Sequence, residues 1–453
     1  MAFEINKTEL VWPGKYDVEG NLVQAPRVSL PFQVIERVNE TRATREAKKA
    51  EGLTLFEVWD GAAMPRLALG SDDAGSAWWK SFIQGGWPVP TSARREVGIL
   101  DLFSGAGGLS LGVKLAARSL GIDAHTYAAV DVDDTALRAY HVNHKPDEII
   151  HDSVRNLVSY SVVKDDDGFR FGSSPTIRHS GIAANQDKIS VVVGGPPCQG
   201  HSTFNNKTRH KDVRNELYLT VPAMAVALDA EVVIIENVPH VRAAKENVVG
   251  AAIDLLKSAG YQVTDGVLSA NAMGWPQTRS RFFIVATKPW KPTPVGMVED
   301  VLSREARDLA WLIGDIADRN DETLMTSTPV LSPENQERVR VLHEHQGGVY
   351  ELPEFVRPQA HIDSPTYKAV YGRLHWDKPA QTITTGFLTP GRGRYVHPSK
   401  YRTINPLEAA RIQGFPDSYR FENGGEKTTR SMLTKWIGDA VPSPLGFAAG
   451  LAA

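Results

Sequence analysis

The sequence predicts an α/β fold built on a doubly wound, mostly parallel sheet. From Val97 to about Lys288, short apolar runs alternate with stretches of helical pattern. This alternation is typical of βαβ units, in which a helix connects two neighbouring parallel strands. The expected strands are Val97 to Phe103, Tyr127 to Val132, Ile189 to Gly194, Glu231 to Asn237 and Arg281 to Thr287.

The 453 residues divide into four parts. Residues 1–95 are an N-terminal extension of unknown role, and residues 96–288 carry the α/β pattern. Residues 289–404 are richer in proline and charge and are expected to form a smaller domain. Residues 405–453 become helical again, with Asn405 as the N-cap before a proline. Four tryptophans in the extension indicate a small packed unit or a surface that docks on the main domain: Trp59, Trp78, Trp79 and Trp87.

The composition excludes several classes of protein. The single cysteine rules out an internal disulfide and a cysteine-based zinc cluster, and no metal site is expected. The chain begins without a secretory signal, and no apolar run is long enough to span a bilayer, so a cytoplasmic location without membrane contact is expected. The net charge of −3 gives no overall signature of nucleic-acid binding.

Two local segments could nevertheless contact phosphates. Residues 203–216 contain four lysines and arginines against two acids. Residues 389–402 contain four basic residues and no acid, interleaved with Tyr395 and Tyr401. A short basic run is usually a solvated loop, but glycine, arginine and aromatic residues together suit phosphate contacts better than an average loop does.

The cysteine, Cys198, follows an apolar strand and the turn Gly194-Gly-Pro-Pro. A lone cysteine in a large chain is most often a small buried apolar residue. Here the strand would deliver Cys198 to the carboxyl edge of the sheet, where open α/β sheets bind their ligands. The strand and turn that precede Cys198 therefore favour a role for it as a nucleophile.

Three further strand ends carry polar residues. The turn Asp101-Leu-Phe-Ser-Gly-Ala-Gly-Gly opens a helix, and Asp131 ends the next strand, where its carboxylate can accept hydrogen bonds from a ribose. Together they indicate an adenosine-containing cofactor, with a nicotinamide dinucleotide and S-adenosylmethionine both open. Glu236 ends a third strand and can act as an acid or hydrogen-bond partner for a bound base.

These motifs, in this order, resemble those of the DNA (cytosine-5) methyltransferases over roughly residues 97–453, apart from a variable middle region. The matching segments are Asp101-Leu-Phe-Ser-Gly-Ala-Gly-Gly, Pro196-Pro-Cys-Gln-Gly, Glu236-Asn-Val, Gln277-Thr-Arg-Ser-Arg, Arg373 with Asp377-Lys-Pro and Thr382-Ile-Thr, and Gly438-Asp-Ala-Val-Pro. The resemblance implies a Rossmann-like S-adenosylmethionine-dependent domain. A target-recognition domain at 289–404 would accompany it, and residues 405–453 would complete the catalytic domain.

The resemblance also implies a role for each matching residue. Cys198 would attack C6 of cytosine and Glu236 would hold and protonate N3, while Arg279 and Arg281 would help to hold the site. The S-adenosylmethionine site would comprise Phe103, Gly105, Gly107, Asp131, Asp152, Pro197, Leu217 and Asp439. The expected DNA contacts are Gln199, Ser202, Lys207, Arg209, Arg392 and Arg394. Asp439 departs from the family, which commonly has asparagine there, and a carboxylate lacks the donors of an amide.

The expected activity is methylation of C5 of a flipped cytosine in double-stranded DNA, by a monomer that forms the modification half of a restriction-modification system. A cognate restriction endonuclease would then act on the same site. A tRNA cytosine-5 methyltransferase is the alternative within the same chemistry. A non-catalytic DNA-binding module should have lost the thiol or the acid, and a nicotinamide-dependent dehydrogenase would leave Cys198 and Glu236 without a role.

Overall fold

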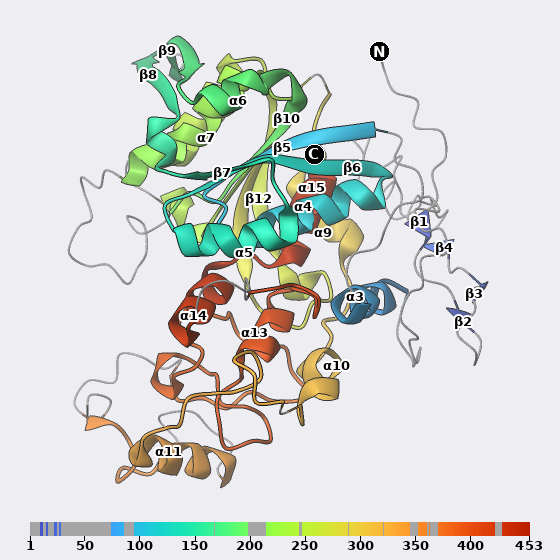
Figure 1. Cartoon of the computed structure of the whole chain (residues 1–453), viewed down its shortest axis with the longest axis vertical. Helices are drawn as coiled ribbons and strands as arrows, with labels where there is room; N and C mark the ends of the chain where they lie inside the picture. Colours follow the sequence, from blue (N-terminus) through green and yellow to red (C-terminus); the bar gives the residue numbers. More distant parts are fainter. Residues whose placement is uncertain are drawn as a thin grey trace.

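A seven-stranded sheet forms the centre of the molecule in the computed structural model (Figure 1). Its strand order is β12-β13-β11-β10-β5-β6-β7. The five strands from β11 to β7 are parallel, whereas β13 runs antiparallel to both β11 and β12. The strand bounds are β5 Arg95–Leu102, β6 Ile122–Asp131, β7 Glu148–His151, β10 Ile189–Gly194, β11 Val232–Asn237, β12 Gln262–Ser269 and β13 Ser280–Thr287. The structure describes residues 10–11, 15–16, 22–24, 27–28, 74–85, 95–166, 168–197, 214–243, 247–288, 290–319, 321–344, 352–359, 362, 370–421 and 428–453.

Helices cover both faces of the sheet, because its central strands are apolar on both sides. In β10, Val191 and Val193 belong to one buried cluster and Val192 to the other. The first cluster includes residues of α4, α9 and α15, and the second includes residues of α7 and α8. Two-sided burial of this kind is typical of parallel strands. These helices span α4 Gly108–Ser119, α7 Arg214–Leu228, α8 Val248–Ser258, α9 Val295–Leu302 and α15 Ser443–Ala452.

We call the sheet, its covering helices and the hairpin of β8 (Val158–Asp165) and β9 (Gly168–Ile177) the sheet lobe. α5 (Asp134–His144) and the short α6 (Ser180–Ala184) also belong to it. The described residues between Leu309 and Asp439 lie below it in Figure 1, and we call them the lower lobe. The lower lobe contains α10 Leu309–Ile313, α11 Pro333–Glu344, α13 Pro406–Ile412 and α14 Arg430–Asp439, joined by irregular segments.

The structure confirms the predicted fold class and all five expected strands. It adds the edge strands β7 and β12, which the apolar pattern missed because much of their length is only partly buried. α13 begins as expected: the Asn405 side chain accepts from the backbone N–H of Glu408, and the Glu408 side chain accepts from that of Asn405. This reciprocal capping box satisfies two donors that a helix start would otherwise leave unpaired.

The N-terminal region contributes one helix to the described structure, α3 (Ala74–Gly85), which carries Trp78 and Trp79. Short strand pairs, β1 (Leu10–Val11) with β4 (Arg27–Val28) and β2 (Lys15–Tyr16) with β3 (Leu22–Gln24), precede it. Trp59 and Trp87 lie outside the described residues. Within the described ranges, no helix combines the length and apolar character needed to cross a membrane.

Candidate active site

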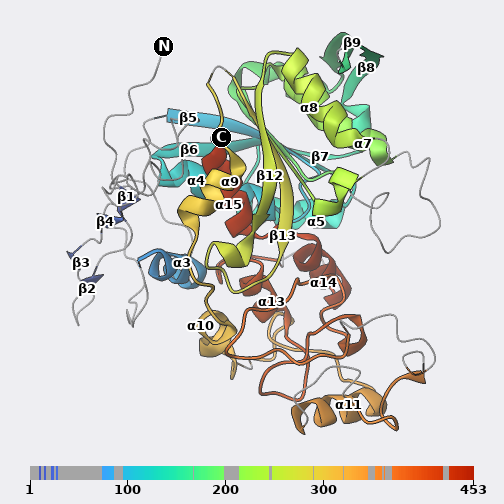
Figure 2. The same ribbon diagram turned by 180° about the vertical axis from the view of Figure 1, so that it is seen from behind.

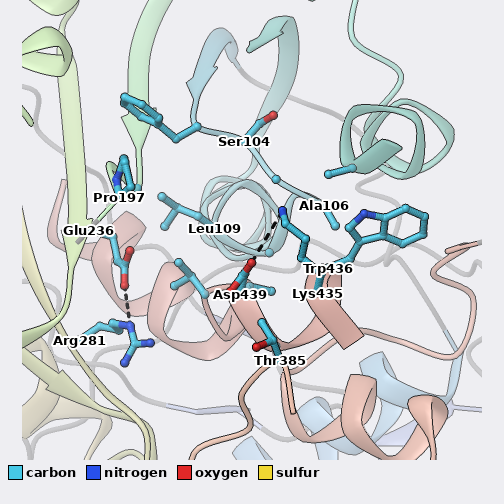
Figure 3. A pocket seen from close by; sticks show the side chains of 18 of the residues that line it. Ser104, Ala106, Leu109, Pro197, Glu236, Arg281, Thr385, Lys435, Trp436 and Asp439 are labelled. Atoms are coloured by element: carbon cyan, nitrogen blue, oxygen red, sulfur yellow. Dashed lines mark ion pairs between the residues drawn. The ribbon is translucent and has the colours of Figure 1, made fainter. Parts of the chain in front are cut away.

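A cavity of about 640 Å³ opens at the carboxyl ends of the parallel strands (Figure 3). One wall consists of residues at the ends of β5, β6, β10 and β11, among them Phe103, Asp131, Gly195 and Glu236. The opposite wall consists of residues 382–385 and the end of α14. The two lobes therefore each contribute one wall, and their relative position sets the width of the cavity.

Glu236 lies in the sheet-lobe wall and is paired with an arginine. Arg281 Nε on β13 lies 2.7 Å from Glu236 Oε1, and the two side chains are only 15% and 9% exposed. Burial raises the pKa of the Glu236 carboxyl above its usual value, although Arg281 and Arg279 oppose that rise. A buried acid with a raised pKa keeps its proton to a higher pH than a solvated carboxyl does, which suits it to proton transfer to a bound base.

Arg279 connects the two walls. Its side chain is buried, and its Nη1 donates to the backbone carbonyls of Ile383 at 2.7 Å and Gly438 at 3.2 Å. These two carbonyls belong to the two segments that form the opposite wall. Charged hydrogen bonds of this kind are stronger than neutral ones, so Arg279 fixes that wall against β13.

The turn that leads from β10 towards Cys198 is held from β11. Asn237 Nδ2 donates to the Pro196 carbonyl at 3.0 Å. A Cβ on Gly195 would lie 3.2 Å from Glu236 Oε2, closer than most real Cβ contacts, so the glycine lets the turn pass the carboxylate. Pro197 lines the cavity, and Cys198 itself lies outside the described residues.

The glycine-rich turn after β5 is fixed by the acid that ends β6. Asp131 accepts hydrogen bonds from the backbone N–H groups of Gly105 and Asp133, both at 2.8 Å. Gly107 has a φ of 87°, and a Cβ there would lie 2.3 Å from His144 Nε2. Any side chain at Gly107 would therefore need both a strained backbone and displacement of a buried histidine.

A buried polar network lies beneath this turn. Tyr419 of the lower lobe donates to the Ala106 carbonyl and lies 2.9 Å from His144 Nε2. Asp101, at the end of β5, accepts from Ser110. Burial raises the pKa of Asp101 from 3.8 to about 7, against the hydrogen bonds from Ser110 and Tyr140. The network ties the turn to the lower lobe.

This shift gives a pH-dependent contribution to stability. Because the folded-state pKa of Asp101 is above its unfolded value, its contribution is complete below pH 4 and is lost as the pH rises to about 7. We expect Asp101→Asn to lack this loss. As the pH rises through this range, the free energy of unfolding of the wild type should therefore fall relative to that of the variant, by about 4 kcal/mol or less. Urea unfolding of both proteins at several pH values measures the difference. Parallel stability curves would contradict it.

Comparison with known proteins identifies the family. The family model for C-5 cytosine-specific DNA methylase matches residues 97–452. The chain belongs to this family of DNA cytosine-5 methyltransferases.

Individual relatives agree with the family assignment. The methylase is 38% identical over 356 residues to the Type II methyltransferase M1.BsuMI of Bacillus subtilis (strain 168), covering 78% of this chain and 79% of that protein. It is 30% identical over 362 residues to the Type II methylase M.HgiDII of Herpetosiphon aurantiacus, covering 77% and 92% respectively. The crystal structure of the S. pombe Dnmt2 methyltransferase has the same fold, with a TM-score of 0.52 and 17% identity over 79% of this chain and 98% of that one.

Most of the described candidate residues of the methylase meet at the cavity. Those that line it are Phe103, Gly105, Asp131, Pro197, Glu236, Arg279, Arg281 and Asp439. Gly107 shapes the adjacent turn. Asp152 lies after β7, where it accepts hydrogen bonds from Ser153 and Asn156, and Leu217 lies on α7; neither lines the cavity.

The remaining candidates concern DNA contacts. Arg392 and Arg394 are exposed on the lower lobe. Four others lie outside the described residues, as Cys198 does: Gln199, Ser202, Lys207 and Arg209.

Lys435 on α14 is a further residue of the site, and it was not predicted from the sequence. Lys435 Nζ lies 2.7 Å from Asp133 Oδ2 and 3.9 Å from Asp439 Oδ2, between the two walls of the cavity. Asp439, which departs from the family pattern, thus has a lysine partner four residues earlier on the same helix. That i,i+4 spacing was the available signal, but only the fold shows that the pair faces Asp133.

Proposed function

We propose that this methylase transfers a methyl group from S-adenosylmethionine to C5 of a flipped cytosine in a specific duplex DNA sequence, through a covalent adduct with Cys198. The observation that carries the proposal is the buried Glu236–Arg281 pair, which lies beside the turn that leads into Cys198. Activation of a cytosine ring requires a proton donor and a thiol, and this arrangement puts the proton donor beside the chain segment that leads to the thiol.

The cavity fits S-adenosylmethionine. Its volume of about 640 Å³ is within the range of small-molecule sites. It offers the Asp131 carboxylate for a ribose, and the 69% exposed Val132 and the ring of Phe103 for an adenine. Ser104 Oγ is buried with no hydrogen-bond partner in the described part of the chain, so this wall retains unused polar capacity. When bound, the cofactor would supply an electrophilic methyl group.

Asp131 is the residue whose loss should most weaken cofactor binding. We expect Asp131→Ala to raise the Kd for S-adenosylmethionine by about 10- to 100-fold, since it removes a charged acceptor worth about 1.5–3 kcal/mol. It also frees the Gly105 and Asp133 N–H groups, which would loosen the turn. Titration calorimetry gives the Kd. Asp147→Ala, which removes a more exposed carboxylate that pairs with His125, is the control. Equal affinities of Asp131→Ala and wild type would remove Asp131 from the site.

The proposed reaction follows from the chemistry of cytosine. C5 is a poor nucleophile, so the Cys198 thiolate would add to C6 while Glu236 donates a proton to N3. C5 of the resulting enamine would then accept the methyl group, with S-adenosylhomocysteine as the leaving group. As the methyl group is added, N3 would give its proton back to Glu236. Loss of the C5 proton to water would then expel the thiolate and restore the C5–C6 double bond. Arg281 would hold the Glu236 carboxyl towards the base, and its positive charge would favour the thiolate.

The base must leave the duplex before it can reach this cavity. We assign this task and sequence recognition to the two basic segments and to residues 289–404 as a target-recognition domain. Residues 405–453 would complete the catalytic domain. α15 supports this division in part, since it packs against α4 of the sheet lobe. Arg392 and Arg394, exposed on the lower lobe, would contact phosphates there.

The names of the relatives support a role in restriction and modification, because both M1.BsuMI and M.HgiDII are named Type II enzymes. We propose that this methylase protects its host DNA from an endonuclease that cuts the same sequence. Bisulfite sequencing of DNA from a host that expresses the chain would give the methylated sequence directly.

Parallel reactions with labelled cofactor test the choice of nucleic acid. We expect label in duplex DNA and none in tRNA. Label in tRNA alone would favour the alternative substrate, and the Cys198 chemistry would then apply to RNA.

A further inference from the structure

Helix α3 lies where the two lobes meet, although it is outside the residues 97–452 that match the family model. Figures 1 and 2 show it at the side of the junction opposite to α14, whose end forms part of the cavity wall. The family fold therefore does not account for α3, and its contacts must indicate its role.

One face of α3 packs against the sheet lobe. The rings of Trp78 and Trp79 lie 5.7 Å and 5.4 Å from Phe447 of α15, and Trp79 lies 5.3 Å from Trp275, which precedes β13. Both α3 tryptophans are buried, in the same apolar cluster as Phe447. Burial of large aromatic side chains of this kind anchors a helix firmly.

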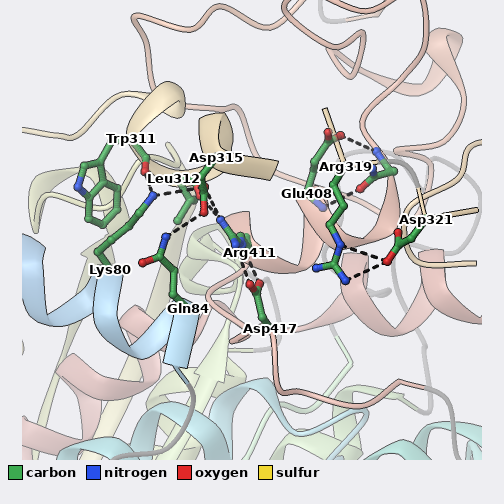
Figure 4. A network of polar contacts seen from close by, with 11 residues as sticks. Lys80, Gln84, Trp311, Leu312, Asp315, Arg319, Asp321, Glu408, Arg411 and Asp417 are labelled. Atoms are coloured by element: carbon green, nitrogen blue, oxygen red, sulfur yellow. Dashed lines mark hydrogen bonds and ion pairs between the residues drawn. The ribbon is translucent and has the colours of Figure 1, made fainter. Parts of the chain in front are cut away.

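The other face of α3 contacts the lower lobe (Figure 4). Lys80 donates to the Trp311 carbonyl and pairs with Asp315 at 3.4 Å, and Gln84 Nε2 donates to Asp315 at 2.9 Å. Lys80 Nζ also lies 5.5 Å from the centre of the Trp311 ring. Lys80 thus binds α10 itself, and both Lys80 and Gln84 bind the segment that follows it.

Asp315 continues this network into the lower lobe. Its Oδ1 accepts from Arg411 of α13 at 2.6 Å, and Arg411 also holds Asp417 through two bonds of 2.7 Å. The backbone N–H of Asp417 in turn donates to the Ile83 carbonyl at the end of α3 at 2.8 Å. The network therefore leaves α3 through Asp315 and returns to it through Asp417.

We propose that α3 is a clamp that fixes the lower lobe relative to the sheet lobe, with Lys80 and Gln84 as positioning residues for DNA. The apolar face anchors the clamp on the sheet lobe. The polar face holds Asp315 after α10, and Asp315 in turn holds Arg411 of α13. Because the two cavity walls come from the two lobes, the clamp contributes to their separation, together with the Arg279 and Tyr419 contacts at the cavity. The part of this inference that concerns DNA rests on the proposed function.

Steady-state kinetics test the effect on DNA. We expect Lys80→Ala/Gln84→Ala to raise the KM for DNA roughly three- to tenfold, as expected for loss of a few partly exposed polar contacts, without a change in the KM for S-adenosylmethionine. Lys80→Arg, in which Gln84, the positive charge and the N–H donors are all kept, should have a KM for DNA close to that of the wild type.

Lys288→Ala is the matched control for these variants. Lys288 also pairs with an aspartate, Asp229 at 2.9 Å, and lies over an aromatic ring, Tyr261 at 4.3 Å, but all three residues belong to the sheet lobe. We expect its KM for DNA to equal that of the wild type. If the double variant merely lowers the Tm and leaves the KM for DNA unchanged, the positioning role is wrong.

A distance measurement tests the clamp without any catalysis. In a Cys198→Ser background, spin labels at Lys164→Cys on β8 and Glu334→Cys on α11 report on the separation of the lobes, since both positions are exposed. We expect Lys80→Ala/Gln84→Ala to broaden the distance distribution and Lys288→Ala to leave it unchanged. An unchanged distribution in the double variant would overturn the clamp. A wild-type protein that methylates no DNA would overturn the proposed function instead, and the distance measurement would still decide the clamp.

Discussion

Cys198→Ser should abolish methyl transfer, with a loss in kcat on the order of 10⁴-fold or more. Serine puts a hydroxyl at position 198 in place of the thiol. The hydroxyl is a far weaker nucleophile towards C6, because it is not ionised near neutral pH. Cofactor binding should be unchanged, since Asp131 and the glycine turn that would hold the adenosine do not depend on the thiol.

Two measurements on the same preparation separate these effects. Transfer of labelled methyl groups to DNA reports the chemistry, and calorimetry with S-adenosylmethionine reports binding. Cys198 is the chain's single cysteine, so no second thiol can substitute for it. Full activity of Cys198→Ser would refute the covalent route, and loss of cofactor binding would show that the cysteine has a structural role instead.

Glu236→Gln should lower kcat by about 10²- to 10⁴-fold, the range typical of a lost general acid. Glutamine keeps the size of the side chain, but its amide is not acidic and cannot transfer a proton to N3. Burial raises the pKa of Glu236, and the carboxyl must be protonated to act as the acid. In the wild type, the rate should therefore also decline as the pH rises above that pKa, because the carboxyl then loses its proton. The variant should lack this decline.

Glu231→Gln is a matched control for this substitution. Glu231 directly precedes β11, the strand that Glu236 lies on, and pairs with Arg95, but both side chains are substantially exposed. We expect its rate to equal that of the wild type, because an exposed pair at the opposite end of the strand contributes little. A rate for Glu236→Gln as high as that of Glu231→Gln would remove Glu236 from the acid role.

The sequence was most informative where a residue's environment depends on its immediate neighbours. Val191 to Val193 are apolar on both faces because β10 lies in the middle of the sheet, and the following glycine marks the strand's end. Asp131 and Glu236 could be found for the same reason, since each directly follows an apolar run that had to be a strand. Asn405 was recognisable because a cap acts within its own first turn.

Other features depend on chain segments that are distant in sequence. The wall at residues 382–385 is fixed by Arg279, about a hundred positions earlier, and Tyr419 reaches the Ala106 carbonyl across more than three hundred positions. Lys435 belongs to the site only because α14 folds back against Asp133. Strand and helix periodicity carry no information on such contacts, because they describe only how a segment is buried.

The central claim is that Cys198 forms a bond to C6 of the target cytosine. DNA in which cytosine is replaced by 5-fluorocytosine tests it most directly, because after methyl transfer C5 carries fluorine in place of the proton whose loss would release the enzyme. With S-adenosylmethionine present, we expect a complex that survives denaturation and in which mass spectrometry places the DNA on the peptide containing Cys198. Cys198→Ser should form none. Methylation of normal DNA without any such complex, or attachment at another residue, would contradict the account.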